Sequence, residues 1–161
     1  LRDFTVLENV ALAVQARLGH SFRFWRDARR DPALTEPARD ILAQIGLAHR
    51  ADALAGVLSH GEHRQLEIAM ALATNPRLLL LDEPMAGMGP DESARMVEIL
   101  RGLKGRVGML LVEHDMDAVF ALADRITVLV YGRAIASGTA EEIRRHPEVR
   151  EAYLGDDEGV H

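Results

Sequence analysis

One stretch of the sequence limits the possible folds more than any other. Four consecutive leucines, Leu78–Leu81, are followed directly by Asp82 and Glu83. An unbroken apolar run of strand length predicts a strand buried on both faces, as in a parallel sheet. Val107–Glu113 has the same character and also ends in a carboxylate. The two runs predict an α/β unit with parallel strands in the second half of the chain.

The remaining segments carry mainly helix signals. Thr5 with Glu8, and Thr139 with Glu142, have the spacing of a capping box, in which two side chains satisfy each other's backbone N–H groups at a helix start. Helices are expected over Phe4–Leu18, Thr35–Gly46, Leu58–Thr74, Pro90–Lys104, Asp115–Ala123, from Thr139 onward, and in a last turn through Leu154; strands Arg125–Val130 and Arg133–Ser137 are expected to form a hairpin. We therefore expect a helical domain over residues 1–74 and an α/β domain over residues 75–161.

Composition excludes several classes of protein. The chain has 161 residues, no cysteine and a net charge of −6, so disulfide frameworks, thiolate metal sites and nonspecific nucleic-acid binding are disfavoured. No apolar run is long enough for a membrane span. His20–Leu34 is rich in arginine and aromatic residues. This segment is expected to be a solvated surface excursion, or alternatively a contact surface for a partner or an anionic membrane.

Asp82 and Glu83 are the strongest candidates for chemistry. The carboxyl end of a strand is where open α/β sheets bind ligands. Of two neighbouring carboxylates, one can hold Mg²⁺, usually through water, while the other accepts a proton from an attacking water. The alternative interpretation is a loop or capping pair of acids, as can follow any buried strand.

Two further segments gain meaning from their positions. Ser59–Glu62 places a serine and a glycine directly before a long helix, where free backbone N–H groups favour phosphate; a plain serine cap is the alternative. His114 directly follows the second apolar run, where it can contact a phosphate or serve a structural role. His60 and His63 have the spacing of a metal pair, but no third ligand is apparent nearby, which disfavours zinc.

Together these segments resemble the ATP-binding subunit of an ABC transporter, over essentially the whole chain. Leu58–Glu62 and the following Arg64–Ala69 resemble the LSGGQ signature and its helix, and Leu78–Glu83 resembles the Walker B strand. Met85–Pro90 occupies the D-loop position and His114 that of the switch histidine. The run Glu113–Met116 and the ending Glu151–Gly155 look most like importers of branched-chain amino acids or similar polar solutes, such as urea or short amides.

The resemblance implies a P-loop NTPase-like α/β fold, in which a helical subdomain precedes the C-terminal part of a mainly parallel sheet with flanking helices. It also implies roles for individual residues. Asp82 holds Mg²⁺ through water, Glu83 is the general base, and His114 contacts the γ-phosphate. The opposite subunit's ATP is bound by Ser59, His60, Gly61 and Glu62, and the dimer interface is formed by Gly87, Met88, Gly89, Pro90 and Asp91.

The resemblance further implies ATP and Mg²⁺ as cofactors and several partners. These partners are a second ATP-binding subunit in a head-to-tail dimer, transmembrane permease subunits that contact the helical part, and indirectly a periplasmic or extracellular solute-binding protein. No nucleic-acid partner is expected. The implied location is peripheral, at the cytoplasmic face of the inner or plasma membrane.

The sequence departs from the family pattern in two ways. His60 replaces the first signature glycine and Glu62 replaces the glutamine, while the phosphate loop G-x-x-x-x-G-K-[ST] and the Q-loop glutamine are absent. We therefore expect the C-terminal part of a longer ATPase, inactive alone and, through exposed strand edges, prone to self-association. The alternatives are a lipopolysaccharide-export-type ATPase, a soluble ABC ATPase acting on nucleic acid or ribosomes, and a non-catalytic interaction module.

Overall fold

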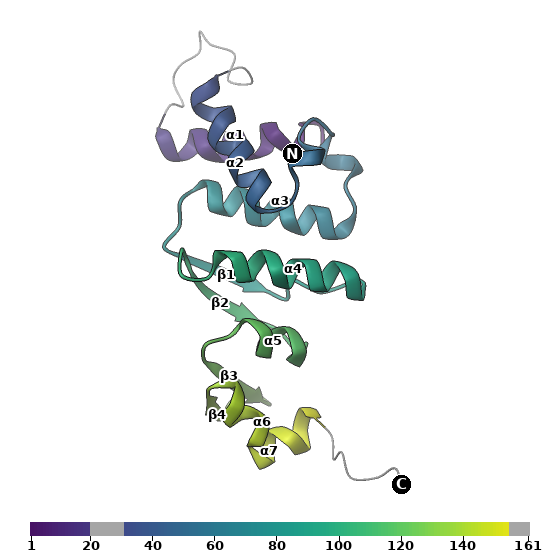
Figure 1. Cartoon of the computed structure of the whole chain (residues 1–161), viewed down its shortest axis with the longest axis vertical. Coiled ribbons are helices and arrows are strands. Elements are labelled where there is room, and N and C mark those ends of the chain that lie inside the picture. The colour runs from purple at the N-terminus through teal and green to yellow at the C-terminus, as the bar shows by residue number, and fades with distance from the viewer. Residues whose placement is uncertain (20–30, 155–161) are drawn as a thin grey trace. The chain divides into compact units, whose positions relative to one another are not determined.

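The computed structural model describes residues 1–19 and 31–154 (Figure 1). These residues form two compact units, which divide between Glu113 and His114. The first unit contains α1 Val6–Leu18, α2 Pro32–Gln44, the short 3₁₀ turns η2 Ala48–Arg50 and η3 Ala55–Val57, α3 His60–Ala73, β1 Leu78–Asp82, α4 Pro90–Leu103 and β2 Gly108–Val112. The second contains α5 Met116–Leu122, β3 Ile126–Val130, β4 Arg133–Gly138, α6 Ala140–Arg145, α7 Pro147–Val149 and the π-helical turn η4 Arg150–Leu154.

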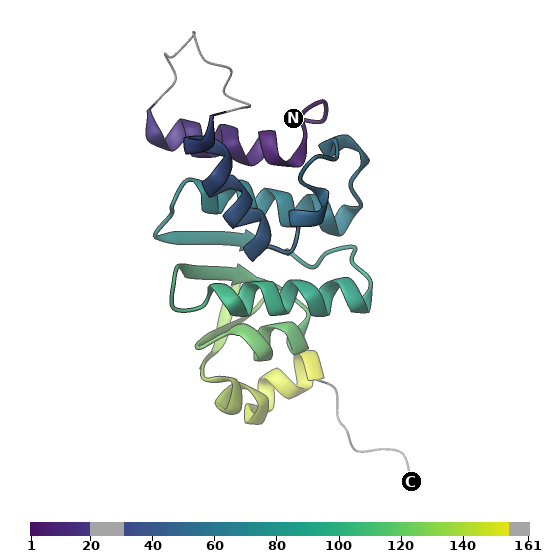
Figure 2. The same ribbon diagram turned by 45° about the horizontal axis from the view of Figure 1, so that its top comes forward.

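Helices α1, α2 and α3 pack together and form the main core of the first unit (Figure 2). Helix α1 buries Val6, Val10 and Val14, which recur at four-residue spacing and so share one face. Leu42 and Leu66 contribute to the same core from α2 and α3. The capping box of Thr5 and Glu8 is confirmed, and Gly19 ends α1 with a positive φ of 68°.

Helix α2 begins earlier than the sequence suggested. Its N-cap is Asp31, whose carboxylate accepts a hydrogen bond from the Ala33 N–H at 3.1 Å. Pro32 at the first helical position has a φ already suited to a helix and no N–H to satisfy, so Asp31–Pro32 is the stronger start signal. The predicted start at Thr35 was therefore wrong. The greater part of the arginine-rich segment His20–Leu34 lies outside the described residues.

Strands β1 and β2 pair in parallel, with Leu78 opposite Gly108 and Asp82 opposite Val112. The predicted burial on both faces is not met. Leu79 is 4% exposed, but the alternate side chains Leu80 and Leu110 are 70% and 58% exposed. The reason is that these exposed side chains share one face of the sheet, and no element within the described residues covers that face.

The second unit packs a hairpin against short helices. Ile126 and Val128 of β3 are buried with Ile143 of α6 and Val149 of α7. Tyr131 and Gly132, with φ values of 47° and 76°, form the two-residue turn that suits a β-hairpin, so the hairpin prediction is confirmed. The Thr139 and Glu142 capping box that opens α6 is also confirmed. No helix within residues 1–19 and 31–154 has both the length and the apolar content needed to cross a bilayer.

Candidate functional site at the end of the parallel strands

The two predicted catalytic carboxylates lie at the carboxyl end of β1. Asp82 is the last residue of the strand and Glu83 follows it, and both are exposed. The Glu83 N–H donates to the Val112 carbonyl at 2.8 Å, which extends the parallel pairing by one step. Glu83 has a φ of 44°, a left-handed conformation that costs a non-glycine residue free energy. An exposed acid held in this conformation marks a candidate functional position.

A sequence of tight turns connects Glu83 to α4. The Ala86 N–H donates to the Glu83 carbonyl and the Met88 N–H donates to the Met85 carbonyl, each at 3.1 Å. Gly87 takes a φ of 74°, which a glycine adopts without strain. The loop of residues 83–89 then ends at Gly89, the N-cap of α4. The predicted interface residues Gly87–Asp91 thus occupy this loop and the first turn of α4.

The loop is held from the end of β2 by Glu113, a strand-end carboxylate to which the sequence analysis assigned no role. Glu113 Oε1 accepts a hydrogen bond from the Met85 N–H at 3.0 Å. Glu113 directly follows β2, and His114 is the next residue and the first of the second unit. An acid at the end of the strand paired with β1 was a visible signal for Glu113, but its partner depends on the register of the two strands.

The signature-like segment begins α3 with a third capping box. The Ser59 hydroxyl accepts from the Glu62 N–H at 3.2 Å, and the Glu62 carboxylate accepts from the Ser59 N–H at 2.9 Å. The other oxygen of that carboxylate lies 3.0 Å from Nε of Arg50. Glu62 is therefore engaged in fixing the start of α3, which is a structural task in addition to its predicted contact with nucleotide.

The structure brings this helix start next to the loop that follows β1. The His60 ring lies with Nε2 3.2 Å from the Ala86 carbonyl oxygen. A Cβ built on Gly61 would lie 3.0 Å from Glu92 Oε1, so only glycine allows α3 and α4 to approach this closely without displacing Glu92. A hollow of about 280 Å³ lies beside these residues, with Ser59 and Met88 in its lining.

The donor groups present fit the cofactors that the resemblance implies. Asp82 and Glu83 offer exposed carboxylate oxygens, the ligand type that Mg²⁺ prefers. The start of α3, a helix of 14 residues, offers backbone N–H groups of the kind that bind phosphate. Within the described residues, no group of three or more His, Asp or Glu side chains is arranged to hold a metal ion. Nδ1 of His63 lies 3.0 Å from the Ser59 carbonyl oxygen.

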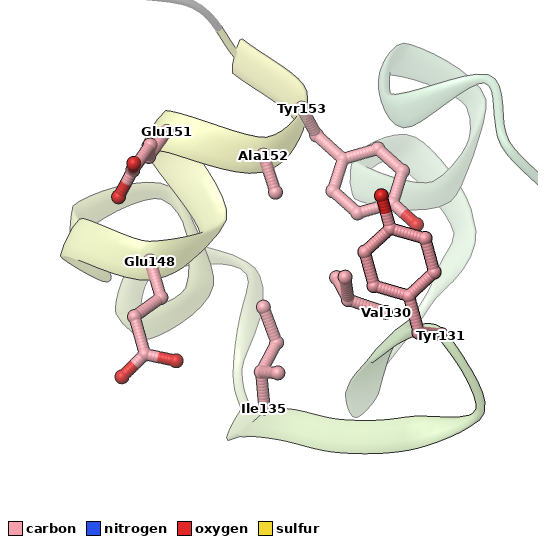
Figure 3. A pocket seen from close by; sticks show the side chains of 7 residues that line it. All are labelled: Val130, Tyr131, Ile135, Glu148, Glu151, Ala152 and Tyr153. Atoms are coloured by element: carbon pink, nitrogen blue, oxygen red, sulfur yellow. The ribbon is translucent and has the colours of Figure 1, made fainter.

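A hollow of about 610 Å³ in the second unit contains none of the predicted site residues. Figure 3 shows the rings of Tyr131 and Tyr153 at one side of it, while the carboxylates of Glu148 and Glu151 point away from those rings. The Tyr153 hydroxyl donates to the Leu129 carbonyl at 2.8 Å, so it serves to fasten the C-terminal turn to the hairpin.

Most of the chain is similar to known proteins. A family model described as ABC transporter matches residues 1–86, and one described as Branched-chain amino acid ATP-binding cassette transporter matches residues 135–159. The high-affinity branched-chain amino acid transport ATP-binding protein LivG of Escherichia coli is 38% identical over 96% of this chain and 64% of its own length. BraF of Pseudomonas aeruginosa, with the corresponding description, is 37% identical over the same shares.

Solved structures give the same picture for the fold. An ATP-binding cassette of an ABC transporter in an ADP conformation matches with a TM-score of 0.76 and 30% identity, covering 97% of this chain and 65% of the cassette. A nucleotide-free cassette matches with a TM-score of 0.75 and 33% identity over the same shares. The predicted fold class and the predicted resemblance are confirmed. The chain spans about 64% of the length of these curated relatives.

Proposed function

Because this chain belongs to the ABC transporter family, we propose that it is part of an ATP-hydrolysing subunit that powers the uptake of branched-chain amino acids or similar polar solutes. The observation that carries the proposal is the pair of carboxylates, Asp82 and Glu83, at the end of β1. Strand β1 pairs in parallel with β2, which leads to His114. The sequence similarity to the branched-chain amino acid transport proteins LivG and BraF favours this importer class over a lipopolysaccharide-export or non-transport ATPase.

Each predicted site residue has a role in the proposed reaction. Glu83 accepts the proton of the attacking water as general base, and His114 contacts the γ-phosphate. Asp82 would hold Mg²⁺ through water, and the bound ion would supply neutralisation of the phosphate charge. The start of α3, Ser59–Glu62, binds the ATP held by the opposite subunit.

The proposed assembly follows from these roles. Two subunits meet head to tail, with Gly87–Asp91 at the interface, and each ATP lies between them. The γ-phosphate completes the binding site across the interface, so its removal by hydrolysis favours opening. We place the subunit at the cytoplasmic face of the membrane. Its helical part, residues 1–74, contacts the permease subunits, and the α/β part, residues 75–161, carries the hydrolytic residues; a solute-binding protein acts through the permease.

The substitution Glu83→Gln tests the general base directly. We expect the protein from the complete reading frame to lose steady-state ATP hydrolysis, because an amide cannot accept the proton, while ATP-dependent dimers persist. Phosphate release measures the first property and light scattering with and without ATP measures the second. An exposed acid on α2, Glu36, provides the control substitution Glu36→Gln. Hydrolysis at the wild-type rate in Glu83→Gln would refute the role of Glu83.

A further inference from the structure

We propose that Glu113 is a positioning residue for Glu83, acting through the backbone N–H of Met85. This inference rests on the proposed ATPase function. Glu113 Oε1 lies 3.0 Å from the Met85 nitrogen, although the two residues are 28 positions apart in the chain. The contact therefore joins the residue that follows β2 to the loop that carries the general base.

The loop after β1 is fixed to the end of the neighbouring strand through Glu83 and also through Met85. The Glu83 N–H donates to the Val112 carbonyl at 2.8 Å, and the Met85 N–H donates to the Glu113 carboxylate. Pro84, between them, has no N–H to donate. One point uses backbone only, whereas the other depends on a side chain. Glu113 is thus a point at which a substitution can release this loop without altering the loop's own sequence.

Release at this point is expected to change the conformation of Glu83. Met85 is 5% exposed, so its N–H would lose an acceptor where little water can replace it. Glu83 is held at a φ of 44°, and such a conformation persists only where surrounding contacts enforce it. Without the Glu113 contact, the backbone can relax toward negative φ, and this rotation would redirect the Glu83 side chain.

The expected kinetic effect falls on kcat. A general base that is displaced by about 1 Å loses roughly ten- to a hundredfold in rate, because proton transfer requires close alignment. ATP affinity depends on other groups, so KM for ATP should change little. A group that merely stabilises the fold would instead reduce the fraction of active protein without a specific loss in kcat per folded molecule.

In this role Glu113 acts through its acceptor oxygen and not through its negative charge. Glu113→Gln keeps an acceptor oxygen at the same reach and should keep most of kcat. Glu113→Asp keeps the charge but is one methylene shorter, so it should lose kcat about as strongly as Glu113→Ala. The expected order is therefore wild type and Gln above Asp and Ala, and it is opposite to the order that a role for the negative charge would give.

The test measures kcat and KM for ATP in these variants of the protein from the complete reading frame, together with hydrogen exchange at the Met85 amide. Glu36→Ala on α2 is the control. We expect Glu113→Ala and Glu113→Asp to lose at least about tenfold in kcat at similar KM and to exchange the Met85 amide faster, with Glu113→Gln close to wild type in both respects.

Three results would overturn the inference. The first is an unchanged kcat in both Glu113→Ala and Glu113→Asp; the second is a loss in Glu113→Gln as large as in Glu113→Ala; the third is Met85 exchange that is unaffected in every variant. Should Glu113→Ala fail to fold, the order of Gln and Asp decides. Should the wild-type protein lack ATPase activity, the proposed function fails, and Met85 exchange alone still decides whether Glu113 fixes the loop.

Discussion

Helices α3 and α6 each begin with a hydroxyl residue that is followed three positions later by a glutamate, but the two helix starts lie in different surroundings. Ser59 with Glu62, and Thr139 with Glu142, each form a capping box. Around the first box, Arg50 pairs with Glu62, and the His60 ring reaches the Ala86 carbonyl across 26 residues. Around the second, the side-chain hydrogen bonds described for Thr139 and Glu142 join only these two residues to each other. A local motif therefore specifies a helix start, and only its tertiary surroundings indicate whether it also belongs to a site.

Removing the two capping hydroxyls is expected to give the largest contrast. Thr139→Ala and Ser59→Ala should each cost about 1 kcal/mol of unfolding free energy, because each leaves one N–H without its acceptor. Only Ser59→Ala should also lower ATP hydrolysis, by roughly tenfold or more, since it removes a group proposed to bind phosphate. Denaturant unfolding and phosphate release measure the two effects. Equal activity losses in both variants would remove the functional distinction between the boxes.

The glycines beside the two boxes provide a smaller contrast. A Cβ on Gly138 would lie 2.5 Å from Glu142 Oε2, so Gly138→Ala should displace the carboxylate from the Thr139 N–H and lower stability by about 1 kcal/mol. Gly61→Ala meets only the mobile end of Glu92 and gains helix propensity, so its stability should be near that of wild type.

Activity should follow the opposite order for these glycines. Gly61→Ala is expected to slow ATP hydrolysis several-fold, since it adds a methyl group where α3 begins and where a phosphate is proposed to approach, whereas Gly138→Ala should have the wild-type rate per folded molecule. Thermal unfolding checks the predicted order of stability and steady-state kinetics checks the predicted order of activity, both measured on the same preparations. Full activity in Gly61→Ala would argue against phosphate binding at this helix start.

The smallest expected effect is a pH dependence of stability that arises at the capping box of Thr139 and Glu142. The backbone hydrogen bond from Thr139, with a further contribution from its hydroxyl, lowers the pKa of Glu142 below its usual value of 4.5. A lowered pKa in the folded state adds stability above pH 4.5, and this stability is lost as pH falls through the lowered pKa. Melting temperature should thus fall slightly less in Glu142→Gln than in wild type on acidification. The same fall in melting temperature with pH in Glu142→Gln and in wild type would contradict this prediction.

Features set by neighbouring residues could be predicted from the sequence. Thr5 and Thr139 were found as caps because their partners lie three residues away, and Tyr131–Gly132 was found as a turn because it lies between two strand patterns. The start of α2 was missed because Thr35 resembles a cap as well as Asp31 does. Here the local signals compete, and the proline that follows Asp31 decides between them.

Features set by pairing across the fold were not predictable in the same way. The contacts of Glu113 with Met85 and of His60 with Ala86 depend on strand register and helix approach, which no local pattern encodes. The leucines of β1 were expected to be buried because an apolar run indicates that both faces of a strand can be buried. The run does not report how many layers cover that strand, and Leu80 lies on the face left open.

The left-handed backbone of Glu83 has a consequence for protein engineering. A glycine at this position would remove a conformational cost of about 1–3 kcal/mol, so a library selected for thermal resistance alone would enrich Glu83→Gly. The variants ranked highest by such a selection would then be those that had lost the proposed base. Directed evolution of this protein therefore needs a turnover criterion alongside heat, because at this position the two selection pressures favour different residues.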